Sequence, residues 1–192
     1  MNKNKKFRVL SIIAVVAVFA GIIYYTGIYN RVKEVNIQCS YMKYSTSDEL
    51  HKNADLILIG TALEKFEDRD HYETRFDDGN LQDFYTKTKF KAQKIIKMPE
   101  KLALTKDSVF DIIEPVGLIQ ESDGRKILKL EGYEPLKEKE IYVVFLKDNG
   151  FGEYSIINMN GGRFNLQNDE NYDNQESKIQ SDVISKYKKE VQ

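Results

Sequence analysis

The segment from Asp68 to Glu73 places three acidic side chains beside the imidazole of His71. Such a group can bind a cation or act as a general base in hydrolysis. The sequence holds no nucleophile motif of the Gly-x-Ser-x-Gly type to accompany it. We therefore interpret the segment as a solvated hairpin tip, and a hydrolase or cation-dependent enzyme built on His71 is the alternative. The other histidine, His51, is expected on the surface of a short helix, with no second zinc ligand at a suitable spacing.

A second acidic stretch has the opening rhythm of a calcium-binding loop. Asp169, Asn171 and Asp173 place side-chain oxygens at alternate positions. The pattern then breaks, because Asn174 stands where the loop needs glycine and Gln180 stands where a bidentate glutamate would close the site. We interpret the stretch as a polar linker and helix cap. The sequence therefore assigns no catalytic, cofactor-binding or metal-ligating residue.

Alternate residues of one expected strand form a basic stripe, which begins at Tyr85 and continues with Lys87, Lys89 and Lys91. The stripe would suit anionic lipid headgroups or wall polymers, but alternating lysines also keep an exposed strand soluble and unpaired. We prefer the second interpretation, because the outer domain is acidic. The whole chain carries a net charge of −1, although residues 1–35 alone hold six basic side chains against one acid. The remainder is acidic, which also disfavours nucleic acid as a partner.

A basic N-terminal start is followed by an uninterrupted apolar run from Val9 to Tyr29. A helix of about 20 apolar residues spans a hydrocarbon core of about 30 Å. The preceding basic residues are expected on the cytoplasmic side, which sends the rest of the chain outward. The alternative is a signal peptide cleaved after Ala20, although the residues that follow stay apolar. We expect a cytoplasmic tail at 1–8, a single-pass transmembrane helix at 9–29, a juxtamembrane linker at 30–44 and an extracytoplasmic domain at 45–192.

Cys39 is the only cysteine of the chain. It lies too far beyond the apolar run to serve as a lipoprotein attachment site. With no second cysteine there is no internal disulfide, so the stability of the outer domain must come from packing.

Apolar periodicity predicts a mainly β outer domain. Residues 54–66 are apolar on both alternating faces, as in a strand covered on both sides. In residues 81–97 one alternating face is apolar from Phe84 onward, and the other face is solvated. Asn160-Gly161 predicts a tight hairpin. Further strands are expected at 109–114, 126–131, 140–147, 154–159 and 163–166, separated by turn residues that include Gly117 and Asn149-Gly150. Helices are expected at 46–53 and from a cap at Asp173 through Ile179, Val183, Ile184, Tyr187 and Val191.

The order of the short helix, the strand at 54–61, the lysine-rich strand ending at Lys97 and the strand at 140–146 resembles netrin/TIMP-like OB modules, and uncharacterised Gram-positive surface proteins with the same pattern. The resemblance covers about residues 39–166 and rests on the strand pattern. It implies a small OB-like antiparallel β-barrel, α+β by strict count, with a short leading helix, a C-terminal helix and an N-terminal transmembrane helix. It also implies that the barrel binds protein through its loops or an open sheet face. Metalloprotease inhibition is not implied, because Cys39 is internal and has no partner cysteine.

The predicted function is a non-catalytic, membrane-anchored binding module that presents its barrel to another envelope or secreted protein. The hydrolase built on His71 is the first alternative. The second is an accessory subunit of a membrane complex, whose transmembrane helix pairs with a channel or sensor. Gly21 and Gly27 are six residues apart rather than four, so the helix lacks the Gly-x-x-x-Gly spacing that would favour this pairing.

Overall fold

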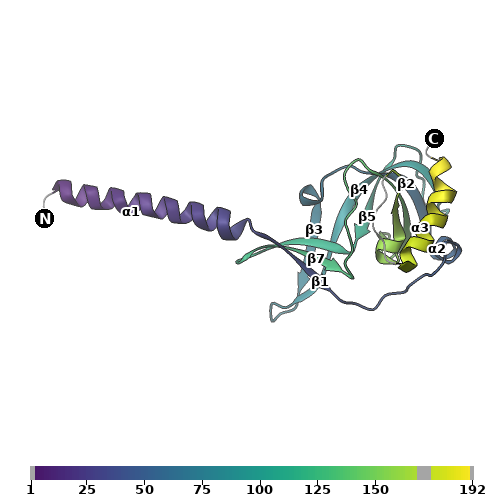
Figure 1. Ribbon diagram of the computed structural model, residues 1–192, viewed down its shortest axis with the longest axis horizontal. Coiled ribbons are helices and arrows are strands. Elements are labelled where there is room, and N and C mark those ends of the chain that lie inside the picture. The colour runs from purple at the N-terminus through teal and green to yellow at the C-terminus, as the bar shows by residue number, and fades with distance from the viewer. Residues whose placement is uncertain (1–2, 168–173, 191–192) are drawn as a thin grey trace.

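The computed structural model describes residues 3–167 and 174–190, and a long helix projects from one end of a β domain (Figure 1). Helix α1 (Lys3–Tyr24) continues into the π-helical turn η1 (Tyr25–Tyr29). The window Leu10–Tyr29 is long and apolar enough to span a membrane, and none of it is buried against the domain. The prediction of one N-terminal helix with the properties of a membrane span is therefore confirmed.

The β domain contains a closed five-stranded barrel, so the predicted small β-barrel with flanking helices is confirmed. Its longest strand, β4 (Leu81–Lys97), pairs with β5 along one edge and with β2 and β3 along the other. Strand β9 closes the barrel, because it pairs in parallel with β5 and antiparallel with β8. The remaining strands of this sheet are β2 (Leu56–Ala62), β3 (Asp70–Arg75), β5 (Val109–Glu114), β8 (Ile141–Asp148), β9 (Tyr154–Ile156) and β10 (Arg163–Asn165), the last paired with β8.

Strand β2 is buried on both faces, as its sequence predicts. Leu56 and Leu58 pack inside the barrel, whereas Ile57 and Ile59 belong to a separate apolar cluster on its outer side. Two helices, α2 (Ser47–Asn53) and α3 (Asn174–Tyr187), contribute to that outer cluster together with residues of β8 and β10. The helices do so through Leu50, Ile179, Val183, Ile184 and Tyr187. They lie together at the end of the domain away from α1 (Figure 1). The closing helix is thus confirmed, while its predicted cap Asp173 and its last apolar residue Val191 lie outside the described residues.

A second, three-stranded sheet overturns two predictions, and we refer to it as the small sheet. Strand β1 (Val32–Ile37) pairs in parallel with β7 (Gly124–Leu130), and β7 pairs antiparallel with β6 (Val116–Glu121). The prediction of a linker at 30–44 is therefore wrong for residues 32–37, which form β1. The sequence around β1 does not reveal this strand, because its parallel partner lies far along the chain. The sequence also suggested a break at Gly117, yet this glycine lies inside β6. Its lack of a side chain lets the Phe84 ring pack closely, because a Cβ there would stand 3.1 Å from the ring.

The hairpin predicted at Asn160-Gly161 is also wrong. The short helix η3 (Met159–Gly162) occupies this position, and the strands on either side of it both pair with β8 rather than with each other. Asn158 and Met159 turn the chain here, with φ of 59° and 50°. The Asn158 side chain then fixes the turn, because its amide donates to the Gly161 carbonyl at 3.3 Å. Two other short helices are η2 (Phe66–Asp68) and η4 (Lys188–Glu190).

Candidate binding groove

The segment from Asp68 to Glu73 is not a solvated hairpin tip. It contains the end of η2 and the first residues of β3, and the turn between β3 and β4 comes later, at residues 76–80. Asp70 and Glu73 are exposed, while the Arg69 side chain is turned into the barrel. The structure therefore disperses the acidic side chains instead of gathering them around His71.

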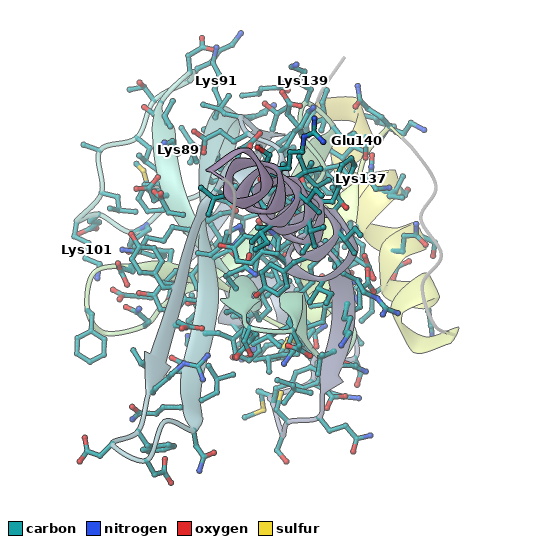
Figure 2. All side chains as sticks on the ribbon, turned by 90° about the vertical axis from the view of Figure 1, so that its left-hand side faces the viewer. Lys89, Lys91, Lys101, Lys137, Lys139 and Glu140 are labelled. Carbon is teal, nitrogen blue, oxygen red and sulfur yellow. The ribbon has the colours of Figure 1, made fainter. Side chains whose placement is uncertain are left out.

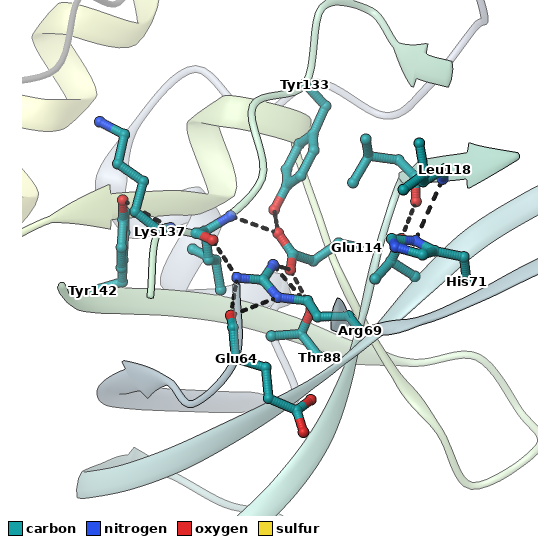
Figure 3. A network of polar contacts seen from close by, with 12 residues as sticks. Glu64, Arg69, His71, Thr88, Glu114, Leu118, Tyr133, Lys137 and Tyr142 are labelled. Atoms are coloured by element: carbon teal, nitrogen blue, oxygen red, sulfur yellow. Dashed lines mark hydrogen bonds and ion pairs between the residues drawn. The ribbon is translucent and has the colours of Figure 1, made fainter. Parts of the chain in front are cut away.

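Arg69 and Glu114 form a fully buried ion pair inside the barrel, with 2.7 Å between Nη1 and Oε1 (Figure 3). The guanidinium also donates twice to the carbonyl of Glu64, at 2.9 and 3.1 Å. The Glu114 carboxylate accepts three more hydrogen bonds, from the Thr88 hydroxyl, the Tyr133 hydroxyl and the Leu136 amide. Because both charged groups are satisfied by protein partners, we assign this network to the stability of the barrel.

Tyr133 holds its proton firmly within this network. Complete burial raises the pKa of its phenol well above the usual range, and the Glu114 carboxylate acts in the same direction. The phenol therefore remains a hydrogen-bond donor to the carboxylate, at 2.8 Å. The Tyr133 phenol thus stays protonated across the physiological pH range, as a structural hydrogen-bond donor requires.

His71 links the barrel to the small sheet. Its Nδ1 lies 2.8 Å from the Thr86 hydroxyl and accepts from the Leu118 amide of β6 at 3.3 Å. The imidazole also packs edge-on against Phe66, with 4.8 Å between ring centroids. Burial lowers the pKa of His71, and the Arg69 guanidinium adds to this, while the Phe66 backbone and nearby carboxylates oppose it. A neutral histidine in this position is a structural bridge between two sheets.

The described residues contain no cluster of three or more His, Cys, Asp or Glu side chains that could hold a metal ion. His51 lies on α2 as predicted, and its Nδ1 contacts the Tyr187 hydroxyl at 2.9 Å. Asp169, Asn171 and Asp173, which suggested a calcium loop, lie outside the described residues.

The basic stripe on β4 is matched by acids from neighbouring segments. Lys87 pairs with Glu153, Lys89 with Glu64 and Lys91 with Asp107, at 2.6, 2.9 and 3.0 Å. Figure 2 shows Lys89 and Lys91 projecting from the same side of the domain. Tyr85 stacks on Tyr72, with 5.0 Å between ring centroids. The stripe is therefore a row of ion pairs at the surface, which reduces its attraction for anions.

Two adjoining grooves run beside this row, with volumes of about 400 and 540 Å³. They share Ile113 and Glu153 and both border the loop between β8 and β9. The smaller groove has an apolar floor with acidic and amide groups at its rim, and its apolar lining residues include Phe84, Tyr85, Pro115, Leu130, Phe151 and Ile156. A concave apolar surface with a few convergent polar groups is the usual form of a binding site.

Phe151 stands at the tip of the β8–β9 loop with 89% of its surface exposed. The loop is nevertheless ordered, since the side chain of Asn149 accepts from the Phe151 amide at 2.9 Å and the Glu153 amide at 3.3 Å. Gly150 and Gly152 flank the ring with φ of 85° and 84°, a conformation that side chains other than glycine rarely adopt. The loop thus holds a large apolar side chain in water above the rim of an apolar groove.

Sequence reasoning identified Asn149-Gly150 only as a turn and missed the aromatic residue that the turn presents. The available signal was the run Gly-Phe-Gly in a polar loop, where a phenylalanine has no periodic apolar neighbours to pack against. The groove itself had no local signal, because β4, β5, the β8–β9 loop and β7 contribute to it from distant positions. No protein-family model matches this chain, and a comparison with curated proteins finds no similar sequence.

Proposed function

We propose that this protein is a non-catalytic binding module, anchored in the membrane by α1, that holds a segment of another envelope or secreted protein in the groove beside Phe151. The observation that carries the proposal is the 89% exposure of Phe151 next to an apolar groove of about 400 Å³. Exposing a phenylalanine to water forgoes about 1.5–3 kcal/mol of burial. A loop ordered around such a residue is favoured where a partner covers it.

The chemistry of the groove supports a protein segment as its occupant. Phe84, Pro115 and Ile156 offer an apolar floor for one or two aliphatic or aromatic side chains. The Asp83 carboxylate at the rim offers oxygen acceptors, which suit the backbone amides or a basic side chain of an extended peptide. The neighbouring lysines are already paired, so an anionic polymer finds little free positive charge here.

The outward orientation is part of the same proposal. Lys3, Lys5, Lys6 and Arg8 precede the apolar window, and positive residues tend to stay on the cytoplasmic side. The barrel would then face the cell exterior, where envelope and secreted proteins are its available partners.

A photo-crosslinking amino acid placed at position 151 of the full-length protein tests the proposal in its native membrane. The matched control carries the same group at Phe76, which is also exposed, at the tip of the β3–β4 turn. We expect an adduct of one defined mass from position 151 and not from position 76. Phe151→Ala should then weaken binding of the identified partner at least about tenfold, or about 1.4 kcal/mol, while Phe76→Ala leaves it unchanged.

Two outcomes would contradict the proposal. Equal adducts from positions 151 and 76 would mean that exposed phenylalanines crosslink without specificity. An adduct obtained only when the group is placed within α1, for example at Val16, would move the function into the membrane helix and favour the accessory-subunit alternative.

A further inference from the structure

The end of the membrane-compatible helix runs directly into the small sheet. The amides of Asn30 and Arg31 close the last helical turn by donating to the carbonyls of Tyr25 and Ile28, each at 3.1 Å. Strand β1 begins at Val32 and pairs with β7 from its first residue. Because only two residues separate η1 from β1, little free chain remains between the helix and the sheet that could act as a flexible tether.

The turn between β6 and β7 also lies against the end of the helix (Figure 1). Gly124 makes this approach possible, since a Cβ there would stand 2.5 Å from the Arg31 carbonyl oxygen and 2.9 Å from that of Ile28. The Arg125 amide donates to the Arg31 carbonyl at 2.8 Å, and the Gln120 side chain donates to the Tyr29 carbonyl at 3.2 Å. The helix end and this turn therefore form one packed unit, which we call the collar and define as residues 24–33 and 120–126.

The charges of the collar differ in sign from those of the outer domain. Arg31, Lys33, Arg125 and Lys126 are its basic residues. Asp123 pairs with both lysines, at 3.0 and 3.2 Å, and the other acid of the collar, Glu121, pairs with Arg75 of β3. Because Asp123 is shared by two lysines, the collar keeps a net positive charge. The collar is thus a basic surface on a domain that is acidic overall.

Tyrosines mark the same level of the helix. Tyr25 stacks on Tyr29 with 5.8 Å between ring centroids, and Tyr24 lies 6.3 Å from Tyr29. Tyr24 and Tyr25 are exposed. Tyrosine rings with one apolar and one polar end favour the headgroup zone of a bilayer, so these rings place the collar at that depth.

We infer that the collar is a membrane-contact site, in which Arg31 and Arg125, with Lys33 and Lys126 beside them, bind the phosphates of anionic phospholipid headgroups. Basic residues near an anionic bilayer surface are attracted to its phosphates. The backbone pairing of β1 with β7 connects this contact site rigidly to the rest of the domain. The barrel is consequently held in a fixed orientation on the bilayer.

This inference rests on the membrane anchoring within the proposed function, but not on the groove or its partner. The test uses the full-length chain with Cys39→Ser, in nanodiscs with and without phosphatidylglycerol. A spin label is attached in turn at Ser122→Cys in the collar, Val16→Cys in the helix and Ser185→Cys on α3, which lies at the opposite end of the domain (Figure 1). Collisions with oxygen and with a water-soluble nickel complex report the depth of each label.

We expect the label at 16 to lie in lipid, the label at 185 in water, and the label at 122 at headgroup depth, with nickel accessibility at least threefold below that at 185. Arg31→Gln with Arg125→Gln should remove most of this protection in phosphatidylglycerol bilayers. Lys178→Gln with Lys186→Gln on α3 removes the same charge and should have no effect. Both pairs lie at exposed or partly exposed positions, so neither should unfold the barrel.

Three results would overturn the inference, and they separate it from the rest of the proposal. A label at 122 as accessible as that at 185, with the label at 16 in lipid, leaves the anchor intact and eliminates the collar contact. Protection at 122 that survives loss of both arginines eliminates phosphate binding by them. A label at 16 that lies in water eliminates the membrane anchor on which the inference rests.

Discussion

The barrel buries side chains on both faces of β2, whereas the small sheet buries only a few side chains against the barrel wall. Inside the barrel, packing is joined by the buried pair of Arg69 and Glu114. The small sheet contributes Ile119 and Leu128, which pack against Phe84 of β4, and Val116, which reaches the core of the barrel. Because burial of apolar surface is the main favourable term in folding, the two sheets must differ in stability.

Further contacts connect the small sheet to the barrel besides this packing. Gly117 packs against the Phe84 ring, the Leu118 amide donates to His71, and Glu121 pairs with Arg75 at 2.8 Å. Regions with few buried contacts open locally at lower free energy than the core. We therefore expect the barrel to dominate the free energy of unfolding, and the small sheet to determine how the barrel is oriented on the helix.

Glu114→Ala should have the largest effect, because it leaves the Arg69 guanidinium buried without a counter-charge. We expect the free energy of unfolding to fall by about 3–5 kcal/mol. Urea denaturation of the full-length protein in nanodiscs, followed by near-ultraviolet circular dichroism of the tyrosines, would measure this loss.

The matched control for the buried pair is Arg69→Met combined with Glu114→Leu, which removes both charges and keeps similar volume. This double variant should recover a large part of the lost stability, because no charge remains buried without a partner. A double variant less stable than Glu114→Ala would show that the hydrogen bonds, rather than the unpaired charge, dominate the effect.

Leu128→Ala should have a smaller and more local effect. Removing a buried leucine costs about 2–5 kcal/mol in a well-packed core, and the loss here falls on the small sheet. Hydrogen exchange should speed up in β1, β6 and β7 and stay unchanged in β2 and β8. Leu58→Ala in the barrel is the matched control and should speed up exchange throughout the domain. Equal effects of the two variants on β2 would mean that the two sheets unfold as one unit.

Apolar periodicity in the sequence predicted those elements that pack one whole face against a single continuous surface. The two-faced run 54–66 yielded β2, and the alternation from Phe84 to Ala92 matches alternating burial in β4. The spacing of Ile179, Val183 and Tyr187 predicted α3. In each case a local pattern was sufficient, because one element meets one continuous partner surface.

Features made by distant segments left no such pattern. Strand β1 is exposed along most of its length and is defined by backbone pairing with β7, so its residues show no apolar period. Arg69 was judged part of a polar loop, because its partner Glu114 is remote in the sequence and only the fold makes them neighbours. Phe151 was overlooked since periodicity finds buried residues, and this one is exposed.

Acidification should loosen the small sheet before the barrel. An unfolded histidine has a pKa near 6.5, and burial lowers the pKa of folded His71, so the unfolded state binds the proton more readily. The stabilising contribution of neutral His71 is therefore complete above about pH 6.5 and is lost as pH falls below that value. Protonation of Nδ1 would also remove the acceptor of the Leu118 amide.

Exchange in β6 and β7 should accelerate severalfold between pH 7.5 and 5.5, after correction for the intrinsic effect of pH. His71→Phe should abolish this acceleration and His51→Gln should preserve it, because His51 lies on α2, away from the small sheet. Acceleration that persists in His71→Phe would assign the pH response to another group.

Asp123→Asn should have the smallest effect on stability. It should also separate the stability of the small sheet from the contact of the collar with lipid. Lys33 and Lys126 lower the pKa of Asp123, so its carboxylate stays ionised throughout the physiological range. Both ion pairs lie at the surface, where such contacts contribute little. Exchange in the small sheet should therefore change less than about twofold.

The substitution nevertheless removes the acid that offsets the two lysines, so contact of the collar with phosphatidylglycerol should strengthen. A label at Ser122 should then become less accessible to water. A large loss of stability with no change at Ser122 would mean that Asp123 holds the sheet together rather than moderating its charge.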